Sequence, residues 1–130
     1  MNTTWEFSGR EYYFDVSEYE CMKKMGKALS ALRGAAEESE QKSRADKEKN
    51  APGDSPEAVK AQCVMIRAFF SDIFGDEAAE NICGAALSGS RHGTAYMDFI
   101  AFVDLQVKEV NSMRDKIKKK YASRAESLAV

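Results

Sequence analysis

The sequence predicts a mainly α-helical fold (α+β), in which an N-terminal β-hairpin packs on a small bundle of three main helices plus one short helix. Aromatic side chains alternate near the N-terminus around Gly9, as they do in a two-stranded hairpin. Most of the remaining chain repeats its apolar residues every three to four positions, which is the period of an α-helix. At 130 residues, the chain is expected to form a single domain over residues 1–130.

The hairpin is expected over residues 3–15. Gly9 supplies the positive φ that a two-residue turn needs, and the turn is either Ser8-Gly9 or Gly9-Arg10. Such a turn places four aromatic residues on one face, namely Trp5, Phe7, Tyr12 and Phe14. An isolated two-stranded hairpin is marginally stable in water, so we expect this face to pack against the helices.

Four helices are expected, at residues 17–36, 56–74, 77–83 and 95–121. A charged spacer over residues 37–54 separates the first two, and it is either a solvated linker or a frayed extension of the first helix. A loop with three glycines, residues 84–93, precedes the last helix and contains the only histidine.

Residues typical of helix ends support these boundaries. Ser17 and Glu20 have the spacing of a capping box at the start of the first helix. Ser55, followed by proline, is expected to cap the second helix. Asp76 and Thr94 are the expected caps of the short helix and of the last helix.

The charge distribution is uneven although the net charge is only -2. Residues 108–124 contain seven Lys or Arg and two acidic residues, a net charge of +5. The run Lys116–Lys120 is either a basic arm for an acidic partner or nucleic acid, or a solvated helix end stabilised by the helix dipole. The second interpretation is favoured, because domains that bind nucleic acid are usually more basic overall.

The sequence indicates no catalytic residue, cofactor site or metal site. Cys21, Cys63 and Cys83 are too far apart for a zinc or redox motif, so we expect buried thiols. His92 has no nucleophile or carboxylate beside it in sequence, and we expect an exposed loop residue. With no long apolar run and no signal-peptide pattern, we expect a cytoplasmic protein without a membrane span.

Three segments in this order resemble a known family. They are the opening TWEFSGREYYFD (residues 4–15), FSDIFGDEAAENICG (70–84) and FIAFVDLQVKEVN (99–111). In these segments the chain resembles the tail assembly chaperones of long-tailed phages and prophages of Gram-positive bacteria. The first helix departs from the charged, Leu-rich form expected of that family by carrying Met22 and Met25.

The resemblance implies a non-enzymatic protein of the host bacterial cytoplasm that binds the tape-measure protein before the tail polymerises. The major tail protein, which forms the tail tube, is a further candidate partner, and self-association is left open. Exposed apolar or Met-rich surface is what such a binding protein needs. The candidate partner-binding residues are Met22, Met25, Phe70, Phe74, Phe102, Lys118, Lys119 and Lys120. The alternative is a helical adaptor or regulator that binds nucleic acid through its basic last helix, which the overall charge disfavours.

Overall fold

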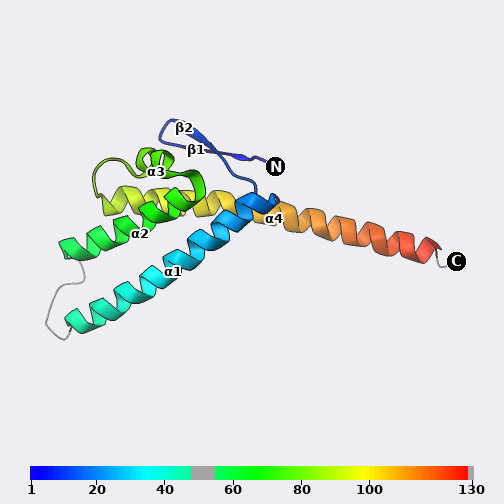
Figure 1. Ribbon diagram of the computed structural model, residues 1–130. Coiled ribbons are helices and arrows are strands. Elements are labelled where there is room, and N and C mark those ends of the chain that lie inside the picture. The colour runs from blue at the N-terminus through cyan, green and yellow to red at the C-terminus, as the bar shows by residue number, and fades with distance from the viewer. Residues whose placement is uncertain (48–54, 129–130) are drawn as a thin grey trace.

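The computed structural model describes residues 1–47 and 55–128, and it confirms a mainly helical fold with an N-terminal hairpin (Figure 1). The elements are β1 (Thr4–Phe7), β2 (Arg10–Tyr13), α1 (Tyr19–Lys47), α2 (Pro56–Phe74), α3 (Asp76–Cys83) and α4 (Gly89–Leu128). Helices α1 and α2 pack side by side, and α4, of 40 residues, runs from beside α3 to the C-terminal end of the molecule. The hairpin and α3 cover the N-terminal half of α4, and its C-terminal half projects beyond them.

The hairpin has the short turn that its aromatic pattern predicts. Strands β1 and β2 are antiparallel, with Trp5 opposite Tyr12. Ser8 and Gly9 form the turn, with φ of 53° and 77°, so both central residues take the positive φ typical of a tight hairpin. Trp5 stacks on Phe70 of α2 with ring centroids 5.8 Å apart. The aromatic face of the hairpin is therefore part of the hydrophobic core.

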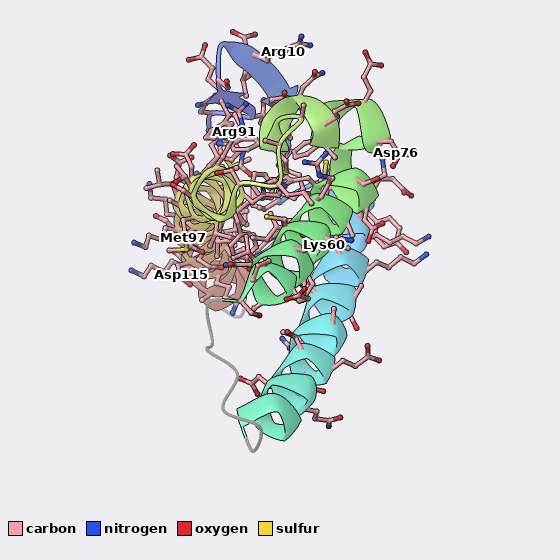
Figure 2. All side chains as sticks on the ribbon, turned by 90° about the vertical axis from the view of Figure 1, so that its left-hand side faces the viewer. Arg10, Lys60, Asp76, Arg91, Met97 and Asp115 are labelled. Atoms are coloured by element: carbon pink, nitrogen blue, oxygen red, sulfur yellow. The ribbon has the colours of Figure 1, made fainter. Side chains whose placement is uncertain are left out.

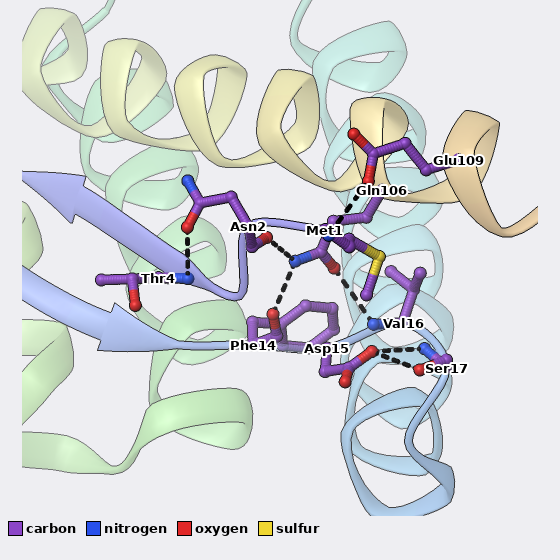
Figure 3. Close-up of polar contacts among 9 residues, drawn as sticks. All are labelled: Met1, Asn2, Thr4, Phe14, Asp15, Val16, Ser17, Gln106 and Glu109. Carbon is purple, nitrogen blue, oxygen red and sulfur yellow. Dashed lines mark hydrogen bonds and ion pairs between the residues drawn. The ribbon is translucent and has the colours of Figure 1, made fainter.

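Gln106 of α4 ties both ends of the hairpin to the helices (Figure 3). Its Nε2 donates to the carbonyl oxygens of Asn2 and Phe14, each at 2.7 Å. Its Oε1 accepts from the backbone N–H of Val16 at 3.0 Å. The side chain is 2% exposed, so one buried amide satisfies backbone groups before and after the hairpin.

Helix α1 differs from its prediction at both ends. Ser17 does not cap it, because its N–H and its hydroxyl both donate to the Asp15 carboxylate, at 2.8 and 2.6 Å. The predicted capping box is therefore wrong, and the helix begins at Tyr19. The helix continues to Lys47, well past residue 36, so the first part of the charged spacer is helical. Residues 48–54 of the spacer lie outside the described residues.

Helices α2 and α3 meet at a glycine. Ser55 caps α2 as predicted, since its Oγ accepts from the N–H of Ala58 at 3.2 Å. Gly75, with φ of 96°, ends α2 and also precedes the first residue of α3. Asp76 does not cap α3, because it is the first helical residue and its carboxylate accepts from the Ser71 hydroxyl. That part of the prediction is wrong.

Helix α4 begins at Gly89, within the predicted glycine loop. Ser88 caps it, because the Ser88 Oγ accepts from the N–H of Arg91 at 3.2 Å. Thr94 lies inside the helix, so the predicted cap and the predicted start at residue 95 are wrong. The sequence predicts Gly89 and Gly93 in a loop, but both lie in the helix, since a helix held by packing tolerates glycine at a modest cost.

Candidate functional site

His92 is buried in α4 and does not lie in an exposed loop. Its Nδ1 lies 2.7 Å from the carbonyl oxygen of Ser88, which can only accept, so Nδ1 carries the proton. Its Nε2 then accepts from the Arg67 guanidinium at 3.2 Å. Burial lowers the pKa of His92, which agrees with a neutral ring. The Nε2 contact joins α2 to the start of α4, whereas the Nδ1 contact lies within the first turn of α4.

Arg67 completes this buried node and sequence reasoning missed it. Its Nη2 also donates to the carbonyl oxygen of Gly84 at 2.7 Å. Gly84 has a φ of 83°, and a Cβ there would lie 2.8 Å from the Arg91 side chain, so the turn requires glycine. The node joins α2, the α3–α4 connection and α4, and it positions helices without presenting a reactive group.

The three cysteines are free thiols. Cys63 and Cys83 are fully buried, as expected, and burial raises the pKa of the Cys83 thiol. Cys21 is half-buried. In the described part of the chain, no three His, Cys, Asp or Glu side chains come close enough together to hold a metal ion.

The structure separates the candidate partner-binding residues into three groups, which are buried, half-buried and exposed. Met25 and Phe70 are buried in the core, which corrects the expectation that they form an exposed surface. Phe74 and Phe102 are half-buried. Hairpin rings pack against Phe74, whereas Phe102 packs against Phe99 of its own helix. Met22 is exposed. The three lysines of the predicted basic run are also exposed, namely Lys118, Lys119 and Lys120.

An open groove of about 620 Å³ lies between the hairpin and α4. Its lining combines apolar and acidic side chains, among them Trp5, Phe102, Leu105, Glu6, Glu11 and Asp98. The Trp5 Nε1 donates to the Asp98 carboxylate at 2.9 Å, which joins β1 to α4 within the lining of the groove. Glu6 and Glu11 are exposed and directly opposite each other in the hairpin. Sequence reasoning missed this groove, because Asp98 comes from a distant helix.

The C-terminal part of α4 forms a second exposed surface, which we call the arm (residues 111–124). Every residue of the arm is exposed, and Figure 1 shows it extending away from the hairpin and the other helices. Met113, Ile117 and Tyr121 recur at a spacing of four and are 63%, 46% and 70% exposed. The arm thus carries an apolar stripe among basic residues, with no covering element in the described part of the chain.

The start of α4 is held to the hairpin by a further polar contact. Figure 2 looks toward the N-terminal end of α4, with Arg91 lying between the hairpin and α3. Arg91 donates to the Ser8 hydroxyl at 3.4 Å and to the Asn81 carbonyl oxygen at 3.3 Å. Met97, on the same helix, is 67% exposed.

Over residues 1–47 and 55–128, no helix has both the length and the apolar character that crossing a bilayer requires.

Comparison with known proteins gives a family and no function. No curated protein and no solved structure matches the chain. A family of unknown function, DUF6673, matches residues 8–127, which include the turn and β2 of the hairpin, but not β1, and all the helices apart from the last residue of α4. The chain belongs to the DUF6673 family.

Proposed function

We propose that this chain is a non-enzymatic phage tail assembly chaperone, which binds the tape-measure protein before the tail polymerises. Tail-tube subunits are a further candidate client, and the protein acts in the cytoplasm of the bacterial host. The resemblance of residues 4–15, 70–84 and 99–111 to that family supports the proposal.

The arm is the observation that carries the proposal. A long helical client needs an apolar face against which its own apolar stripe can pack. Met113, Ile117 and Tyr121 form such a face on a helix whose sides are all open to solvent. Exposed methionine adapts to varied partner sequences, which suits a long helical client.

Co-expression with a long helical tail protein tests this function. Wild-type chain should raise the soluble fraction of that client, measured by sedimentation of the lysate and quantitative blotting. The I117S/Y121S variant should lose the effect, because it removes two apolar contacts from the arm. The control M97S/V64S removes two similarly exposed apolar side chains elsewhere and should retain the effect. No gain in client solubility with the wild type would overturn the proposal.

One observation favours the alternative, a nucleic-acid-binding adaptor. The basic side chains of the arm are all exposed, and none of them forms an ion pair with another described residue. Binding of DNA or RNA that weakens steeply with salt and is lost in the K118E/K119E/K120E variant would support this alternative. A titration that shows no salt-sensitive binding would exclude it.

A further inference from the structure

The groove between the hairpin and α4 has an unbalanced charge. No basic residue is among the described residues that line it, whereas Glu6, Glu11 and Asp98 are acidic. None of these carboxylates forms an ion pair with another residue that the structure describes. The apolar side chains of Phe102 and Leu105 on α4 line the same groove, and Leu105 is 64% exposed. The groove therefore suits a ligand that is both apolar and cationic.

The hairpin register shows why two of these carboxylates favour a cationic ligand. Glu6 of β1 pairs directly with Glu11 of β2. Like charges at directly opposite positions destabilise an antiparallel pair. A cation placed between the two carboxylates would remove that repulsion. The unfavourable pairing of Glu6 with Glu11 is thus explained if a basic segment occupies the groove.

The arm has the complementary chemistry on one of its faces. Lys120 and Arg124 lie within about 60° of Ile117 around the helix axis, and Tyr121 within about 40°. These residues form one face, with two apolar side chains flanked by two cations. Lys118 and Lys119 lie about 100° and 200° from Ile117, outside this face. The face presents to a partner apolar groups that can pack against those of the groove, together with the positive charge that the groove lacks.

The arm cannot reach the groove of its own chain. Phe102 in the groove and Lys120 in the arm belong to the same continuous helix. At about 1.5 Å per residue, they are separated by about 27 Å along the axis. We infer that the groove receives the arm of a second copy of this chain, so that copies associate head to tail. This contact uses different surfaces on the two copies, which leads to rings or to open chains.

The inference rests on the arm being a docking element, as in the proposed function, and it adds that a second copy covers the arm when no client is bound. Its test contains no client, so the two proposals can fail separately. The molar mass of the purified full-length chain is measured over a range of concentrations by sedimentation velocity. Wild-type chain should associate at about 0.1 M salt and dissociate at about 1 M salt, where screening acts over about 3 Å rather than 10 Å.

Matched variants locate the contact. K120E/R124E on the arm face should weaken association about tenfold or more, because like charges would then meet in the groove. E6K/E11K in the groove should have the same effect. K118E/K119E makes the same charge change outside the face, and E37K/E38K makes the groove's change on exposed residues of α1. Both controls should associate like the wild type.

Mixing the two defective variants gives the decisive result. K120E/R124E supplies an intact groove and E6K/E11K supplies an intact arm, so an equimolar mixture should recover association. Circular dichroism and Trp5 fluorescence show whether each variant is folded. The inference is overturned if the wild type is monomeric at every concentration, or if groove variants associate normally. It is also overturned if the controls fail equally, or if the mixture stays monomeric.

Discussion

Replacing Gln106 by leucine isolates the polar contribution of one buried side chain, because the two side chains have similar size. The change removes three hydrogen bonds, to Asn2, Phe14 and Val16. It leaves the N–H of Val16 and the carbonyl oxygen of Phe14 in a buried setting without this partner. An orphaned buried polar group costs about 1–3 kcal/mol, so for these two groups we expect the free energy of unfolding to fall by about 2–6 kcal/mol. That is a large part of the total stability of a small domain, about 5–15 kcal/mol.

Urea denaturation measures this loss with two probes. Circular dichroism follows the helices, and fluorescence follows Trp5, which is the only tryptophan and lies in the hairpin. Both midpoints should move to lower urea in the Gln106→Leu variant. Gln62→Leu is the control, since Gln62 is exposed on α2, and its stability should change by less than about 0.5 kcal/mol. A loss for Gln106→Leu no larger than that of the control would refute the role given to this amide.

Three further predictions concern a titration, a turn and a phenol. Burial lowers the pKa of His92 from 6.5, so below that pH the unfolded chain binds more protons than the folded chain. The free energy of unfolding should therefore be constant above about pH 7.5. It should fall as the pH decreases through 6.5, by at most about 1.4 kcal/mol per pH unit. Urea midpoints against pH should lose this slope in His92→Asn, and an unchanged slope would contradict the assignment. Gly9→Ala should lower the free energy of unfolding by about 1 kcal/mol, because φ at Gly9 is +77°. Gly26→Ala, in open space on α1, should raise it by up to about 1 kcal/mol. Equal effects of the two changes on urea denaturation would argue against the turn conformation at Gly9. A hydrogen bond to Glu18 raises the pKa of Tyr13 to about 12, so this stabilisation is present below about pH 10 and is lost as the pH rises toward 12. Tyr13→Phe should remove the step near pH 12 from an ultraviolet titration of the folded protein, and its persistence would reassign that step.

The hairpin could be predicted from sequence because alternation and Gly9 are local signals. The burial of Phe70 could not, since helical periodicity assigns one buried face to α2 and does not show that the hairpin covers a second. The cap of α1 was mispredicted because Asp15 competes for the Ser17 hydroxyl, a contact that depends on the path of the chain. The prediction that His92 lies in an exposed loop is wrong for a related reason. Its neighbours in sequence are polar, whereas its partner Arg67 comes from another helix.

The groove acids and the arm were visible in the sequence only as separate features. Glu6 and Glu11 follow from the hairpin register, and the basic run from composition. Asp98 lines the same groove as the two glutamates only because of the way the hairpin packs on α4. The exposure of the arm depends on the other helices ending short of it, which no local pattern encodes.

Because Asp98 and Lys120 belong to one unbroken helix, the direction of the arm relative to the groove is set by the number of residues between them. Inserting one residue after Gln106 would rotate everything beyond it by about 100° and shift it by about 1.5 Å. Seven inserted residues, nearly two turns, would restore the direction and lengthen the arm by about 10 Å. Association between the arm and the groove should therefore be lost and regained periodically as α4 is lengthened, and regained at insertions close to whole helical turns.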